Sequence, residues 1–229
     1  YYYTLNETNI FAFEAQHLIK DEDPFYNAIL DDENDAFDNT ATGLGLDLNQ
    51  LSYDLNQERR VKSNQLDAKL DYYNILNSKS NINLTLGTIF SNQKFNSNIF
   101  QFLDDGTRLD PTPTITNEGE LLSAENDNVE YRFSDVYLGV RYRFKTGKFT
   151  FTPGVSFHAY SNQNTQNGDT FKDNFFNVLP DFEARIQFKK SESLQFNYNM
   201  QNTFTDVTNI AEGLVLNNFN SIQYGNPEL

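Results

Sequence analysis

A period-two alternation of apolar and polar residues is the feature that most restricts how this chain can fold. Such alternation places successive side chains on opposite faces of a β-strand, so each run predicts a strand with one apolar face. The predicted strands are a half-strand at residues 1–5, a weaker strand at 11–15, and strands at 66–73, 82–90, 135–144, 149–159, 176–188 and 194–201. In the last six, no charged residue falls on the apolar face. The pattern predicts an all-β chain.

The connections between these predicted strands differ in length. Short connections fall at residues 77–81, 145–148 and 189–193, and long ones at 20–50, 101–128, 161–174 and from 203 to the end. From the first long loop onward, short and long therefore alternate. Tight turns at one end and long loops at the other are typical of outer-membrane β-barrels, in which the tight turns are periplasmic.

Strand length and aromatic placement favour a membrane-spanning sheet. Several runs reach about 10 residues, which is what a tilted strand needs to cross a bilayer. Seven aromatic residues near the short turns resemble an interfacial girdle: Tyr72, Tyr73, Tyr142, Phe144, Phe149, Phe151 and Phe188. Pro153 and Pro180 fall on the apolar face of two runs and predict local bulges or breaks, because proline cannot donate to the ladder.

Composition excludes several classes of protein. The chain has 38% hydrophobic residues and no run of about 18 apolar ones, which excludes helical membrane spans. Its formal net charge of -15 argues against nucleic-acid binding, and its lack of cysteine excludes disulfide scaffolds and Cys-based metal or redox sites. Alternation alone leaves open whether the apolar face meets lipid or a core. A soluble or surface-exposed ligand-binding β-barrel therefore remains the alternative.

A resemblance to a known family lies in the last third of the chain. Residues 178–182 read VLPDF, residues 194–198 read LQFNY, and residues 225–229 read GNPEL after a long loop. This order resembles the barrel of TonB-dependent receptors from Bacteroidetes-type bacteria. The resemblance implies a barrel of about 22 strands, plugged by an N-terminal domain and driven by the TonB complex. It also implies import of a large nutrient such as a siderophore, an oligosaccharide or a peptide.

We therefore expect residues 1–229 to form part of an antiparallel up-and-down transmembrane β-barrel in the outer membrane, with about seven or eight strands. The plug and the remaining strands are expected to lie outside this sequence, and the terminal loop to end without a closing strand. The expected partners are outer-membrane lipid, the TonB complex through the plug, and a candidate surface lipoprotein. A non-importing barrel of a secretion or adhesion complex is a further alternative.

Few residues suggest chemistry, and we expect no enzyme, no cofactor and no catalytic or metal site. Acidic residues at 21–23, 31–38 and 104–110 could offer oxygen ligands to calcium, but they lack EF-hand spacing and favour solvated loops. His17 and His158 lack partners in the sequence pattern. Glu183 and Asp181 share a strand face with Arg185, which predicts ion pairing in the lumen rather than acid–base chemistry. Arg141 and Arg143 are predicted to join the same lining.

Overall fold

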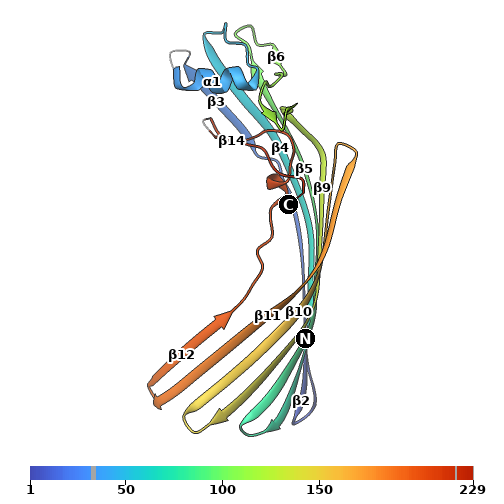
Figure 1. Ribbon diagram of the computed structural model, residues 1–229, viewed down its shortest axis with the longest axis vertical. Helices are drawn as coiled ribbons and strands as arrows, with labels where there is room; N and C mark the ends of the chain where they lie inside the picture. The colour runs from blue at the N-terminus through green and yellow to red at the C-terminus, as the bar shows by residue number, and fades with distance from the viewer. Residues whose placement is uncertain (32–34, 220, 229) are drawn as a thin grey trace.

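The computed structural model describes residues 1–31, 35–219 and 221–228. Its dominant feature is an antiparallel sheet in which consecutive long strands are neighbours. In spatial order these strands are β1 (Tyr2–Asn6), β2 (Asn9–Glu22), β4 (Ser52–Asn77), β5 (Ser80–Phe102), β9 (Glu125–Thr146), β10 (Phe149–Gln166), β11 (Asp169–Lys189) and β12 (Glu192–Asn199). This order confirms the predicted up-and-down all-β class. The sheet is curved and does not close on itself within the described residues (Figure 1).

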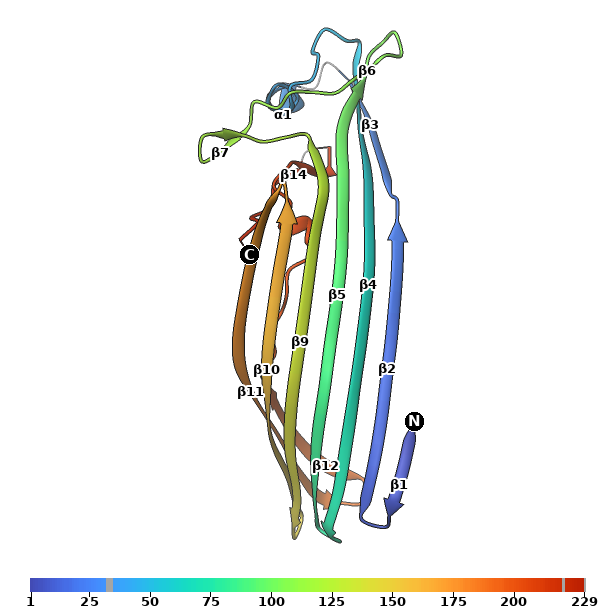
Figure 2. The same cartoon turned by 90° about the vertical axis from the view of Figure 1, so that its right-hand side faces the viewer.

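The strands are longer than the alternation predicts because they continue beyond the apolar band. β4 has 26 residues and β5 has 23. On β5 the outward apolar face runs from Ile82 to Phe90, eight steps of roughly 3.3 Å, which matches an apolar band about 25 Å tall. Above this band β4 and β5 continue upward as a wall (Figure 2), and there the residues on their outward face are mostly polar. The sheet therefore has a membrane-spanning part and a part that projects past it.

The predicted long loop at residues 161–174 is wrong. β10 and β11 continue through this segment, and Gln166 pairs with Asp169 across a two-residue turn. Asn167 and Gly168 in that turn have φ angles of 52° and 88°, the left-handed region that tight hairpin turns require. The segment loses its alternation because water lies on the outward side there, so neither face has to be apolar.

The other long connections contain small elements. β3 (Phe25–Asp31) pairs with β4, and α1 (Asp35–Leu44) follows it. The connection after β5 contains β6 (Arg108–Leu109), which pairs with β5, and the hairpin of β7 (Thr116–Asn117) and β8 (Glu120–Leu121). No helix among the described residues has the length and apolar character to span a bilayer.

Within the described residues, the chain after β12 adds no closing strand to the sheet, as expected, but it folds back onto the sheet and does not dangle as a free loop. It runs along the concave side and contains η1 (Val207–Asn209), β13 (Val215–Asn218) and β14 (Ser221–Gln223) (Figure 1). We call residues 203–219 and 221–228 the inner segment. Its fold-back has a physical reason, because the wall above the apolar band presents aromatic side chains on its concave face that water would otherwise contact.

Only one of the two prolines interrupts the ladder, and neither shifts its register. Pro153 pairs with Phe182 on β11, while pairing toward β9 is interrupted at this point and resumes in register at Gly154. Pro180 lies where β12 ends, and its carbonyl accepts a hydrogen bond from the Met200 backbone N–H, 3.2 Å away. The prediction of breaks is thus correct for Pro153, and neither proline forms a bulge.

Candidate functional site

The two faces of the sheet differ in exposure and chemistry, and this decides which one can carry function. The outward face is apolar and uncovered in the described chain: Leu86 is 55% exposed and Phe196 is 59% exposed. Near the short turns it carries stacked aromatic rings, including Tyr142 with Phe144 at 5.5 Å. Tyr73, one of the residues expected in this girdle, lies instead on the concave face. It pairs with Ile10 on β2 and with Asn83 on β5. The concave face is polar at the level of the apolar band.

A first polar cluster on the concave face links β2, β4 and β5. The ammonium of Lys69 lies 3.2 Å from a carboxylate oxygen of Glu14 and 3.8 Å from one of Asp71. Asp71 is buried and accepts hydrogen bonds from the Thr85 hydroxyl and the Asn83 amide. Each carboxylate therefore has a cationic or hydrogen-bonding partner, as groups at the level of a bilayer require.

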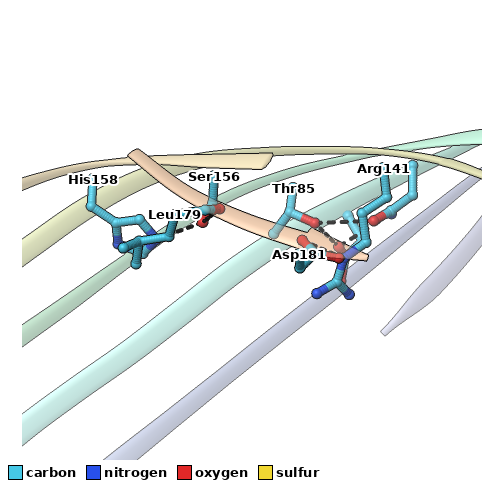
Figure 3. A network of polar contacts seen from close by, with 8 residues as sticks. Thr85, Arg141, Ser156, His158, Leu179 and Asp181 are labelled. Carbon is cyan, nitrogen blue, oxygen red and sulfur yellow. Dashed lines mark hydrogen bonds and ion pairs between the residues drawn. The ribbon is translucent and has the colours of Figure 1, made fainter. Parts of the chain in front are cut away.

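A second cluster crosses β9, β10 and β11. The Nε of Arg141 donates to Asp181 at 3.0 Å (Figure 3). Gly154 on β10 pairs with both residues and so lies between them in the sheet. A Cβ at Gly154 would lie 2.5 Å from an Asp181 oxygen and 2.7 Å from the Arg141 Cγ. This ion pair therefore needs glycine beneath it. The predicted lumen pairing of Asp181 is correct, but its partner is Arg141 on β9.

His158 is the centre of a third cluster. Its Nδ1 lies 2.9 Å from an Asp135 oxygen and its Nε2 lies 3.0 Å from the Ser156 hydroxyl (Figure 3 shows His158 and Ser156). The imidazole stacks between Tyr137 and Tyr160, with ring centroids 5.0 and 5.4 Å away. Tyr137 in turn covers a glycine on β5. The sequence pattern missed this cluster because its members come from different strands, and only the register brings them together.

The connectivity Asp135–His158–Ser156 is that of a Ser-His-Asp triad, so its chemical competence needs to be considered. A triad also needs hydrogen-bond donors that stabilise the oxyanion of the intermediate. Ser156 lies in the middle of β10 and pairs with Gly139 on β9 and Leu179 on β11, so the neighbouring backbone groups belong to the ladder. Its hydroxyl also lies 3.4 Å from the Leu179 carbonyl. The geometry orients the imidazole, while the backbone around Ser156 is paired with strands on both sides.

Above the apolar band, the concave face changes from polar to apolar and holds the inner segment. Phe95, Val129 and Tyr131 on the wall pack against Val207 and Ile210 of this segment, and these residues are all buried. Burial raises the pKa of the Tyr131 phenol above its usual value. A second buried cluster lies higher and joins α1 to β4, β5 and β13; it contains Phe37, Ala41, Leu44, Leu46, Tyr53, Leu55, Ile99, Ala124, Leu214 and Leu216.

Buried amide side chains of the wall pair with the backbone of the inner segment. Gln57 accepts from the Leu216 N–H at 2.6 Å. Asn126 accepts from the Gly213 N–H at 2.7 Å and donates to the Leu214 carbonyl at 3.1 Å. Gln166 donates to the Ile210 carbonyl at 2.7 Å and accepts from the Glu212 N–H at 3.1 Å. The inner segment does not join the large sheet, so these side-chain amides supply the hydrogen bonds that a neighbouring strand would otherwise give to its backbone.

The Gly-Asn-Pro segment closes this arrangement. The Gly225 N–H donates to the Ala211 carbonyl at 2.7 Å, and the Asn226 N–H donates to the Asn209 carbonyl at 3.0 Å. Asn164 on β10 donates to the Pro227 carbonyl at 2.9 Å. A Cβ at Gly225 would lie 2.4 Å from the Asn209 carbonyl oxygen, so only glycine fits. The motif therefore fixes the end of the inner segment to the wall; Leu229 lies outside the described residues.

The acidic segments do not converge on a common site. Asp21 pairs with Arg60, whose Nη2 lies 2.9 Å from a carboxylate oxygen, and this hydrogen bond lowers the pKa of Asp21. Hydrogen bonds from Thr107 likewise lower the pKa of Asp105. Asp38 accepts from the Tyr53 hydroxyl at 3.0 Å. Residues 32–34 of the predicted acidic loop lie outside the described residues. Within the described ranges, no three His, Cys, Asp or Glu side chains could hold a metal ion.

His17, Glu183 and Arg185 each form a separate side-chain hydrogen bond. His17 lies on the outward face and its Nε2 is 2.7 Å from the Asn64 side-chain oxygen. Glu183 accepts from Gln195 at 3.1 Å, and Arg185 lies 3.5 Å from the Ser193 hydroxyl. The three polar side chains of β11 thus lie on the concave face as predicted. Glu183 and Arg185 have hydrogen-bond partners on the neighbouring β12 and, among the described residues, form no ion pair with each other, whereas the ion-pair partner of Asp181 lies two strands away on β9.

Comparison with known proteins agrees with this architecture. The sequence profile of the outer membrane protein beta-barrel family matches residues 24–229. The chain belongs to this family. As a member of the outer membrane protein beta-barrel family it is located in the outer membrane, where its uncovered apolar face meets lipid. A search of curated proteins found no match.

Among solved structures, this family member is similar to the ferric citrate transporter FecA in the unliganded form. The TM-score is 0.52 at 10% sequence identity, a likeness that concerns the fold alone. The similarity covers 86% of this chain and 25% of the FecA chain, so the chain spans about a quarter of the length of the structure it matches. The polar clusters described above therefore lie on the concave side of a wall in an outer-membrane barrel.

Proposed function

We propose that this chain forms part of the barrel wall of a TonB-dependent outer-membrane importer for a nutrient too large for porins. The proposal rests on the concave face of the sheet. Clusters of ionisable side chains around Lys69, Arg141 and Asp135 lie there at bilayer level, on a widely curved sheet. Ionisable groups at this depth are costly unless they line an aqueous or protein-filled lumen. The fold likeness to the ferric citrate transporter supports a barrel of this kind.

In this proposal the short turns face the periplasm and the projecting wall faces outward from the cell, as in other outer-membrane barrels. The TonB complex would act through a plug domain, with a surface lipoprotein as a further partner. Residues 1–229 contain no cysteine, so a single cysteine introduced into them tests the orientation of the full-length protein, with labelling of the unaltered protein as the background. Asp105→Cys should react with a membrane-impermeant maleimide on intact cells, whereas Lys190→Cys, in the β11–β12 turn, should react only after lysis. The reverse labelling would contradict the orientation.

Import itself is tested by growth. Deletion of the full-length gene and deletion of the TonB complex should impair growth on the same nutrient, screened among ferric siderophores, oligosaccharides and peptides. If deletion impairs growth on none of them while surface adhesion or secretion is lost, the protein is a non-importing barrel instead.

We further propose that the barrel carries no enzymatic chemistry. The Asp135–His158–Ser156 cluster is the only arrangement among the described residues that we consider as a catalytic candidate. A fluorophosphonate probe, which labels activated serines, should leave Ser156 unmodified in the purified full-length protein. Labelling that disappears in Ser156→Ala and in His158→Ala would show an activated nucleophile and overturn this part of the proposal.

A further inference from the structure

A cavity of about 380 Å³ lies on the outward face at the place where the apolar band ends. Its lower edge is formed by four residues that are consecutive partners across β4, β5, β9 and β10: Leu66, Phe90, Ser134 and Ser161. The small side chains of Ser134 and Ser161 leave a hollow between the larger neighbours. Below this row the outward face is apolar, so the hollow lies at the boundary between lipid tails and headgroups.

The next row upward carries cations and amides. It consists of Asn64, Asn92, Arg132, Gln163 and Lys172, which are consecutive partners across the sheet. Arg132 and Lys172 are both neighbours of Gln163, on opposite sides, so their backbones are about 10 Å apart, or two strand spacings. Both side chains are long enough to reach one group bound above Gln163. None of the described residues that line this cavity is acidic.

The charge at this level is opposite to that of the chain as a whole. The first two outward rows above the band contain four cations, Lys62, Lys94, Arg132 and Lys172, and two carboxylates, Asp21 and Glu130. These rows are therefore net positive in a chain whose formal net charge is -15. Glu130 contacts Arg132 at 3.0 Å and Lys94 at 4.0 Å, and Asp21 contacts Lys62 at 3.7 Å. Among the described residues, Lys172 has no ion-pair partner.

We propose that this cavity binds the phosphorylated sugar headgroup of an outer-leaflet glycolipid. From the apolar band upward, the sheet presents apolar side chains, then the hydroxyls of Ser134 and Ser161, then the cations Arg132 and Lys172. These groups match, in the same order, the acyl chains, the sugar and the phosphate of such a lipid. Phosphate accepts charge-assisted hydrogen bonds from both arginine and lysine. The inference uses the outward orientation of the projecting wall proposed above, and it does not depend on import.

The test measures binding of diphosphorylated lipid A to the full-length protein in detergent, by fluorescence anisotropy of a labelled lipid. Arg132→Gln/Lys172→Gln should weaken binding about 30-fold, since each basic side chain at an anionic surface contributes roughly fivefold. Lys148→Gln/Lys190→Gln removes the same charge at the short turns and should leave binding unchanged. The charge-keeping swap Arg132→Lys/Lys172→Arg should restore most of the affinity.

A second comparison uses the unaltered protein alone and so does not depend on the folding of any variant. Lipid A from which the phosphates have been removed should bind as weakly as lipid A binds to the double glutamine variant. Equal binding of the two lipids overturns the proposal, as does equal binding by the double variant and the unaltered protein. Tighter binding of phosphatidylglycerol than of lipid A assigns the site to a phospholipid and overturns the glycolipid assignment.

Discussion

Substitution of Gly87 by alanine tests the packing of the lumen face most directly. A Cβ at Gly87 would lie 2.2 Å from the Tyr137 Cζ, so the phenol ring would have to leave its place against the His158 ring. Overpacking of this kind costs about 1–3 kcal/mol. Gly139→Ala is the matched control, because its Cβ would meet no atom closer than 3.5 Å. The control should stabilise the protein by up to about 1 kcal/mol, since glycine weakens strands.

The assay is the denaturant midpoint of the full-length protein in lipid vesicles, followed by the gel mobility difference between folded and unfolded barrel. Gly87→Ala should lower the free energy of unfolding by about 1–2 kcal/mol, while Gly139→Ala should not lower it. The double variant Gly87→Ala/Tyr137→Ala should be less destabilised than the sum of the two single changes, because the clash is removed. Equal effects of the two glycine substitutions, or strict additivity in the double variant, would refute the reasoning.

Three further predictions concern other parts of the sheet. Leu86→Arg places a charge near the middle of the outward band and should cost about 2–4 kcal/mol in vesicles, whereas Thr152→Arg on the lumen face should change unfolding by less than about 1 kcal/mol. Asp21→Asn should lower stability near neutral pH. The Arg60 hydrogen bond lowers the pKa of Asp21 in the folded protein below its ordinary 3.8. The stability that Asp21 contributes is therefore present above pH 3.8 and is lost as the pH falls through the folded pKa. A stability difference between Asp21→Asn and the unaltered protein that persists in acid would contradict this reasoning. Gly225→Ala should release the inner segment and speed its cleavage by added protease on intact cells, and unchanged cleavage would show that the close contact with Asn209 is not what holds it.

The membrane-spanning strands and their faces are predictable from the amino-acid sequence. Within the bilayer every outward residue must be apolar, so alternation appears wherever a strand crosses it. For this reason the pattern at residues 82–90 and 135–144 predicts both a strand and the face on which each side chain lies. The two-residue turn at Asn167 and Gly168 also has a local signal, because Asn-Gly is a strong hairpin sequence, but the polar residues around it favour a loop.

The projecting wall, the lumen clusters and the inner segment were decided only by the tertiary structure. Above the band both faces of a strand meet water or protein, so the one-sided requirement that creates alternation disappears. The ion pair of Arg141 with Asp181 joins residues 40 positions apart, and the Gln57 amide meets Leu216 across 159 positions. Such contacts depend on strand register and on where the chain folds back, which local periodicity does not encode. By itself the sequence determined which side chains share a face, whereas the curvature and register of the sheet determined which of them meet.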